Sequence, residues 1–141
     1  MTHPVTLAGI NHVTLTVTDL ATSEAFYSRH LGFQTRADRG WRKIMHNGVV
    51  MLVINTPADK NAPVPEHDRF SENRVGLDHL SFSVGSLAEL EAAAAYFDAE
   101  GVVRGEIHDL GDIYVMAFRD PDNIQLELTA PGGGNRGAEK K

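Results

Sequence analysis

The chain has 141 residues, a net charge of −6 at pH 7, 42% hydrophobic residues and no cysteine. This length suits one domain with a core of its own, and the acidic balance argues against nucleic acid or an anionic membrane as a partner. Without cysteine, disulfides, thiolate metal sites and a thiol nucleophile are excluded. The sequence does not predict a signal peptide. The longest apolar run, 49–54, is far shorter than the roughly 20 residues of a membrane span. A cytoplasmic protein is therefore expected.

One block of sequence occurs twice. Residues 9–21 align without a gap with residues 76–88, which lie 67 positions later (76 − 9 = 67). The matched pairs include Gly9/Gly76, Ile10/Leu77, Asn11/Asp78, His12/His79 and Leu20/Leu87. A match of this length predicts two copies of one supersecondary unit.

The first copy opens on a strand that alternates between apolar and polar residues, which predicts one apolar and one polar face. The apolar side carries Val13, Leu15 and Val17. A helix over about 20–31 should follow, because Asp19 suits an N-cap and Gly32 a C-cap. Three strands are then expected near 33–38, 41–46 and 49–55.

The second copy follows the same plan. Ser86 and Glu89 form a capping box for a helix that ends at Gly101. Three further strands are expected near 102–108, 112–119 and 124–129. The chain is therefore predicted to be an α+β protein of two βαβββ modules. The expected boundaries are module one at 8–55, a linker at 56–75, module two at 76–130 and a disordered tail at 131–141.

Three metal-competent side chains are predicted on polar strand faces. His12 and His79 lie opposite the apolar residues of the opening strands, and Glu127 lies on the polar side of the last strand. Two imidazoles and one carboxylate can hold a divalent metal ion and leave positions open for water or substrate. The alternative is structural, with each histidine paired to its preceding residue or capping a strand end. Leu52 is expected at the repeat position of Glu127.

The sequence resembles the vicinal oxygen chelate superfamily, which includes glyoxalases, bleomycin-resistance proteins, extradiol dioxygenases and fosfomycin-modifying transferases. The likeness is carried by residues 9–20, by Ala25-Phe-Tyr and Leu31-Gly-Phe, and by segments 76–80 and 118–128. It implies paired βαβββ modules that form a cupped mixed sheet, usually a homodimer, and metal ligands at His12, His79 and Glu127.

Departures from the family pattern bear on the reaction. Metal-dependent glyoxalases typically have a fourth protein ligand, where this chain has Leu52. Thr14 matches a threonine of the fosfomycin-type substrate site, but the basic loop of those transferases is missing from residues 107–112. Ring-cleaving dioxygenases have a tyrosine where Ala117 stands.

Two further residues are catalytic candidates. Tyr114 and His108 lie close to Ala117 in sequence and are candidates to replace that tyrosine and its assisting histidine. His108 is otherwise a general base or a solvated edge residue. Tyr114 shares its strand face with Met116 and Phe118, so core packing explains it equally well.

The expected function is that of a divalent-metal-dependent lyase or dioxygenase acting on a small oxygen-chelating substrate. Fe, Mn, Ni, Co and Zn all suit the ligand set. The alternatives are a metal-free protein that binds a small molecule such as an antibiotic, and a fosfomycin-type thiol transferase. The partners expected are a small-molecule substrate and a second copy of the chain. The metal site would form within one chain or across that homodimer.

Overall fold

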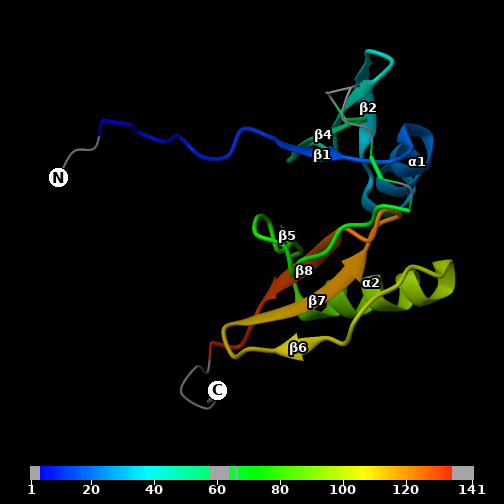
Figure 1. Ribbon diagram of the computed structural model, residues 1–141. Helices are drawn as coiled ribbons and strands as arrows, with labels where there is room; N and C mark the ends of the chain where they lie inside the picture. Colours follow the sequence, from blue (N-terminus) through cyan, green and yellow to red (C-terminus); the bar gives the residue numbers. More distant parts are fainter. Residues whose placement is uncertain (1–3, 58–63, 66, 135–141) are drawn as a thin grey trace. The chain divides into compact units, whose positions relative to one another are not determined.

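The computed structural model describes residues 4–57, 64–65 and 67–134, and the chain divides into two compact units, Met1–Glu66 and His67–Lys141. Among its described residues, the first unit has one helix and four strands, which Figure 1 labels. These are β1 (Val13–Thr16), α1 (Leu20–Leu31), β2 (Gln34–Asp38), β3 (Arg42–His46) and β4 (Met51–Asn55). The strands form one sheet in the order β1-β4-β3-β2.

The second unit repeats this plan. Its elements are β5 (Leu80–Ser83), α2 (Leu87–Glu100), β6 (His108–Asp109), β7 (Ile113–Arg119) and β8 (Gln125–Pro131). Their sheet has the order β5-β8-β7-β6. In each unit the first strand runs parallel to the last and the other neighbours are antiparallel, so both sheets are mixed. The prediction of two βαβββ units is confirmed.

Local signals set the ends of both helices. The Asp19 carboxylate accepts hydrogen bonds from the backbone N–H and the hydroxyl of Thr22, which satisfies one free donor of the first turn of α1. Ser86 does the same for α2 by accepting from the Glu89 N–H at 3.2 Å. Each helix ends at a glycine in the left-handed conformation, Gly32 (φ 72°) and Gly101 (φ 73°).

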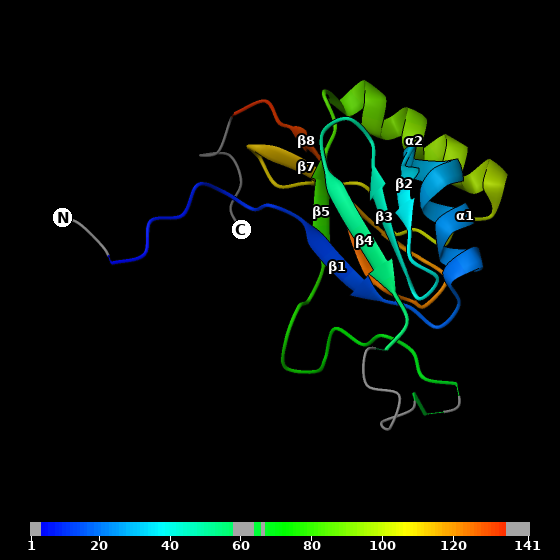
Figure 2. The same cartoon turned by 90° about the horizontal axis from the view of Figure 1, so that it is seen from above.

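Each helix covers the apolar face of its own sheet, as Figure 2 shows for α1 along the sheet of the first unit. In the second unit, Phe97 of α2 packs on Phe118 of β7 with ring centroids 4.7 Å apart. Leu126 and Leu128 of β8 belong to the same buried layer. Because strand side chains alternate, burial of Leu126 and Leu128 directs Glu127 to the opposite face.

The structure differs from the predicted boundaries at three places. β6 has only two residues, and Arg104 contributes an isolated bridge to Phe118 in place of a longer strand. Phe70 and Glu72, expected in the linker, are hydrogen-bonded to the second unit, at the β7–β8 turn and at the end of β7 respectively. β8 continues to Pro131, and the Gly132 N–H donates to the Asp112 carbonyl at 2.9 Å, so the ordered chain extends past the predicted start of the tail. Residues 135–141 lie outside the described part.

None of the helices in the described part of the chain has the length and apolar character needed to cross a membrane.

Candidate metal centre

The polar face of the second sheet carries a row of oxygen-bearing side chains. Register pairs Ser81 with Glu127 and Ser83 with Thr129 across β5 and β8. The hydroxyls of Ser81 and Thr129 lie 2.6 Å apart, and Thr129 donates on to the Glu127 carboxylate at 3.3 Å. Ser81 must then donate to Thr129, because the Thr129 proton is engaged. These hydroxyls orient the Glu127 carboxylate on the face away from α2.

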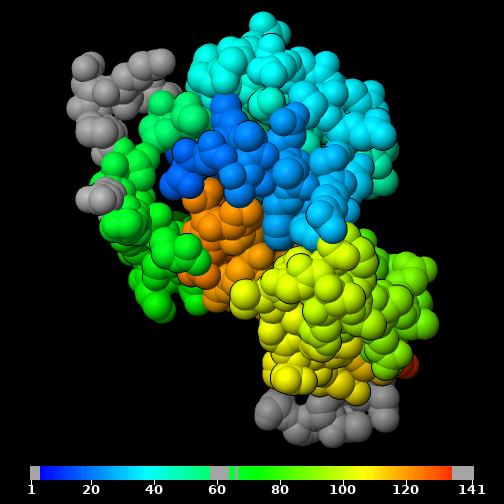
Figure 3. Space-filling model, turned by 90° about the vertical axis from the view of Figure 1, so that its right-hand side faces the viewer, coloured from blue at the N-terminus to red at the C-terminus, as the bar shows by residue number. Residues whose placement is uncertain are grey.

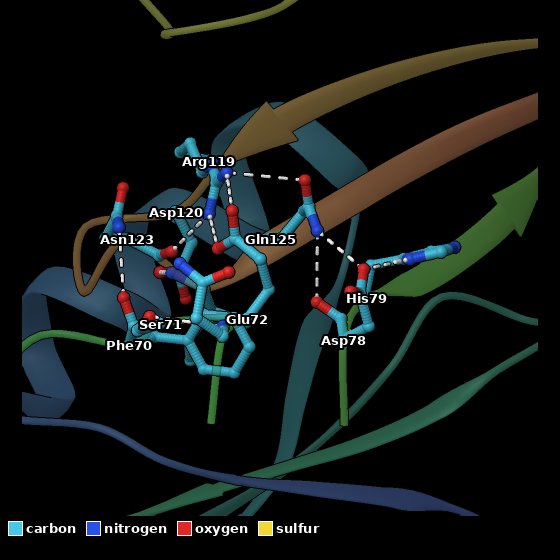
Figure 4. Close-up of polar contacts among 11 residues, drawn as sticks. Phe70, Ser71, Glu72, Asp78, His79, Arg119, Asp120, Asn123 and Gln125 are labelled. Atoms are coloured by element: carbon cyan, nitrogen blue, oxygen red, sulfur yellow. Dashed lines mark hydrogen bonds and ion pairs between the residues drawn. The ribbon is translucent and has the colours of Figure 1, made fainter. Parts of the chain in front are cut away.

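His79 immediately precedes β5 and lies beside Glu127, with 3.6 Å between His79 Nε2 and Glu127 Oε1. On the other side of the ring, Nδ1 is 2.8 Å from the Asp78 carboxylate (Figure 4). The His79 side chain is 40% exposed and that of Glu127 20%, so the pair is open to solvent without being fully solvated. The structure thus brings together two of the three predicted ligands.

The hydrogen bond to Asp78 determines what His79 presents to Glu127. An ionised carboxylate only accepts hydrogen bonds, so Nδ1 carries the proton in this contact, and the neutral form of the ring has its lone pair at Nε2. That lone pair and the Glu127 carboxylate are two acceptors that face each other 3.6 Å apart. Such a pair is stabilised by a cation between its members, either a proton on Nε2 or a bound metal ion. Donor atoms bound to one metal ion at about 2.0–2.2 Å lie roughly 3.0–3.6 Å apart, so the separation fits a shared metal ion.

The first unit offers one imidazole and no carboxylate at the matching positions. His12 is exposed just before β1, with Nδ1 2.7 Å from the Asn11 side-chain oxygen. Thr14 is exposed on the same polar strand face. The two registers, Val13 with Leu52 and Leu80 with Leu126, make Val53 the counterpart of Glu127.

The expectation that Leu52 holds this position is therefore wrong by one residue. Leu52 is fully buried and pairs with Val13, as Leu126 pairs with Leu80. Because β-strand side chains alternate, a shift of one residue exchanges the faces. Neither valine nor leucine can bind a metal ion, so the first unit still lacks a fourth ligand at this position.

The remaining two candidates lie on different faces of the second sheet. His108 pairs with Val115, which shares the face of Glu127, and the imidazole is exposed. The segment around β6 forms part of the molecular surface in Figure 3 (yellow). Tyr114 pairs with buried Ala130 and shares the helix-covered face of Met116 and Phe118. The structure therefore does not bring Tyr114 to the side of the sheet that carries Glu127.

A polar network behind His79 contains residues that the sequence did not single out for the metal centre. Gln125 donates to the Asp78 carboxylate at 2.9 Å and accepts from Arg119 at 3.3 Å. Arg119 in turn forms two hydrogen bonds with Glu72, of 2.9 and 3.0 Å. Two of these pairings join residues 47 positions apart in the chain, so no local pattern could have found them. The strand parity of Gln125, which places it on the polar side of β8, was the only available signal.

The ion pair between Glu72 and Arg119 should make the stability of the second unit depend on pH. The guanidinium hydrogen bonds lower the pKa of the Glu72 carboxyl from 4.5 to about 2. A depressed pKa contributes stability that is complete above about pH 4.5 and is lost as the pH falls toward 2. The Glu72→Gln variant is therefore expected to unfold at a lower temperature than the unmodified chain at pH 6, with a difference that shrinks toward pH 2. Thermal unfolding followed by circular dichroism across this range measures it.

Glu91→Gln, on the exposed surface of α2, is the matched control and should leave the pH profile unchanged. A Glu72→Gln difference that stays constant from pH 6 to pH 2 would contradict the assigned pairing.

Comparison with known proteins identifies the family. Residues 9–128 match the model of the Glyoxalase/Bleomycin resistance protein/Dioxygenase superfamily. The chain belongs to this superfamily. A relative among curated proteins is the uncharacterized protein YwkD of Bacillus subtilis (strain 168), which is 30% identical over 132 residues, 86% of this chain and 96% of the relative.

Two solved structures illustrate the superfamily fold. A glyoxylase/bleomycin resistance protein/dioxygenase domain from Frankia sp. EAN1pec is 31% identical, with a TM-score of 0.74 over 92% of this chain and 96% of the other. A mutant of the fosfomycin resistance protein FosX from Listeria monocytogenes, in complex with Mn(II) and 1S,2S-dihydroxypropylphosphonic acid, is 22% identical. Its TM-score is 0.71 over 93% of this chain and 96% of that structure. At that identity the second likeness concerns the fold alone.

In the part of the chain that the structure describes, no three His, Cys, Asp or Glu side chains form a group that could hold a metal ion. Of the three predicted ligands, His79 and Glu127 lie together in the second unit. The remaining candidate, His12, belongs to the first unit.

Proposed function

We propose that this chain is a divalent-metal-dependent enzyme of the glyoxalase and dioxygenase type, acting on a small substrate with two adjacent oxygen atoms. His12, His79 and Glu127 would hold the metal ion, with His12 supplied by the same chain or by a second copy. The observation that carries the proposal is the pair of acceptors, His79 Nε2 and Glu127 Oε1, that face each other at 3.6 Å. A cation stabilises this arrangement, and imidazole with carboxylate is a common donor set for first-row metals.

The bound metal ion would supply Lewis-acid stabilisation of negative charge that develops on a substrate oxygen. The protein side chains would do the rest. Glu127 lowers the charge of the site without filling it, and Thr129 holds its carboxylate in place. Thr14, exposed two residues after His12, would donate a hydrogen bond to a substrate oxygen. His108, exposed on the Glu127 side of the sheet, would accept a proton at its imidazole.

Several features favour a small organic acid or diol as substrate. A metal ion held by three protein ligands has more coordination positions open to substrate than one held by four, and Val53 provides no fourth ligand. The fold neighbour FosX is described in complex with Mn(II) and a vicinal dihydroxy phosphonic acid, which is a ligand of this oxygen-chelating type. Lyase-type or oxygen-dependent chemistry therefore ranks above thiol transfer, since the basic loop of the fosfomycin-type transferases is missing from residues 107–112.

Metal binding is the first test. Protein purified anaerobically, without an affinity column that carries metal, is expected to contain a near-stoichiometric divalent ion by elemental mass spectrometry. After removal of that ion by a chelator, titration calorimetry with Mn(II), Fe(II), Ni(II), Co(II) and Zn(II) should restore one ion per chain. Iron as the native metal would direct substrate screening to oxygen consumption, and the other metals to lyase or isomerase reactions. No metal on purification and none taken up on titration would overturn the proposal in favour of a metal-free binding protein.

A further inference from the structure

A continuous set of hydrogen bonds connects Glu72 to His79 within the second unit (Figure 4). The Gln125 amide is the central link. Its oxygen accepts from Arg119 at 3.3 Å, and its nitrogen donates to the Asp78 carboxylate at 2.9 Å and to the Asp78 carbonyl at 3.1 Å. Because an arginine only donates and a carboxylate only accepts, the amide has one orientation that satisfies both neighbours.

The far end of this network is anchored to the fold. The Phe70 N–H donates to the Asp122 carbonyl at 3.0 Å, and the Asn123 side chain donates to the Phe70 carbonyl at 3.0 Å. These bonds hold the loop that carries Glu72 against the β7–β8 turn. Glu72 then binds Arg119 through both carboxylate oxygens, the paired geometry that gives charge-assisted hydrogen bonds their specificity. These two bonds hold the Arg119 guanidinium in position to donate to Gln125.

The near end of the network determines the state of His79. Asp78, held by Gln125, accepts a hydrogen bond from His79 Nδ1, so in the neutral ring Nε2 has the lone pair beside Glu127. A partner of this kind on the far nitrogen of a metal-binding histidine sets the tautomer, the ring orientation and the basicity of the ligand.

The repeat provides an internal comparison. In the first unit Asn11 takes the place of Asp78, so His12 has a neutral acceptor at 2.7 Å. Met51 takes the place of Gln125 by register, and a thioether cannot donate a hydrogen bond. The Asp78 carboxylate and the Gln125 amide that holds it are therefore a feature of the second unit, although both units have the same order of helix and strands.

We infer that Asp78, Gln125, Arg119 and Glu72 are positioning residues that hold His79 as the tautomer with a free Nε2. The two histidines of the repeat are consequently unequal ligands: His79 has a charged acceptor at Nδ1 that Gln125 holds in place, and His12 has a neutral one. The metal-binding consequence rests on the proposed function. The tautomer of His79 does not, because it is a property of the metal-free chain.

Nitrogen-15 NMR of the metal-free protein tests the inference. At about pH 8, above the ordinary imidazole pKa of about 6.5, long-range couplings to the ring protons report which nitrogen is protonated. In the unmodified chain, His79 is expected to be protonated at Nδ1. Asp78→Ala should move the proton population toward Nε2, whereas the His12 signals stay unchanged. Gln125→Met, which copies Met51 with little change in volume, should shift His79 in the same direction by a smaller amount.

Metal titration of the same variants gives a second readout. Asp78→Ala and Gln125→Met are expected to bind Mn(II) about 10–100-fold more weakly than the unmodified chain. Asp78→Asn, which copies Asn11 and keeps an acceptor for Nδ1–H, should retain the tautomer and lose less affinity. Glu91→Gln on α2 is the control and should change neither readout. Proton–nitrogen correlation spectra establish that each variant is folded.

The outcomes separate the two proposals. An unchanged His79 tautomer in folded Asp78→Ala and Gln125→Met overturns the inference, whatever the metal does. A tautomer that shifts as expected, in a chain that binds no metal even unmodified, supports the positioning role and overturns the proposed function alone.

Discussion

The His79→Ala variant is expected to bind divalent metal at least about 100-fold more weakly than the unmodified chain, a larger loss than removal of an outer partner of the histidine causes. The substitution removes Nε2, which lies 3.6 Å from the Glu127 carboxylate, and leaves that carboxylate without its imidazole neighbour. Competition of the apoprotein with a chelating dye for Mn(II) or Zn(II) measures the change.

His46→Ala is the matched control, because His46 lies on β3 of the first unit and its Nδ1 accepts from the Gly48 N–H in a turn. Its metal affinity should equal that of the unmodified chain. An affinity in His79→Ala within about twofold of that value would remove His79 from the metal site. Glu127→Ala should then be used to determine whether the carboxylate binds metal independently.

Truncation of Phe97 is expected to have a large effect on stability, lowering the free energy of unfolding by about 3–5 kcal/mol. Phe97 is fully buried on α2, and its ring lies 4.7 Å from that of Phe118, so alanine would leave a cavity between helix and sheet. Urea denaturation followed by circular dichroism gives the difference. Since natural domains are stable by about 5–15 kcal/mol, the variant will be close to its unfolding limit.

Tyr96→Ala provides the comparison on the adjacent residue of the same helix, where the side chain is 38% exposed. It changes the aromatic content and the helix propensity in a similar way but leaves the core filled. We expect a clearly smaller loss for Tyr96→Ala than for Phe97→Ala. Equal losses in the two variants would mean that α2 is not packed on its sheet through Phe97.

The internal repeat gives the protein two units of similar fold that differ in their candidate metal ligands and in the hydrogen bonds that orient them. The second unit contains His79, Glu127 and the hydrogen bonds that orient both, and the first contains His12 with a neutral partner. Val53 in place of a carboxylate completes this asymmetry. Under the proposed function, most of the orientation of the metal ion would come from the second unit.

Much of the fold is determined by local sequence. The alternating strands and the two helices, each with Asp19 or Ser86 at one end and glycine at the other, could be predicted because each depends on residues close together in the chain. The duplicated block then predicted that the second unit repeats the first. The same alternation predicted His79 on the polar side of one strand and Glu127 on the polar side of another, and the structure places these two side chains 3.6 Å apart.

The tertiary structure decided what depends on register and on distant partners. It made Val53 rather than Leu52 the counterpart of Glu127, because pairing between strands fixes which residue faces which side. It also joined Glu72 and Arg119, which are 47 residues apart and have no pattern in common. Sequence periodicity describes interactions along one element, whereas these contacts form only when separate elements pack. The hydrogen bonds that hold Asp78 beside His79 could therefore be identified only from the folded structure.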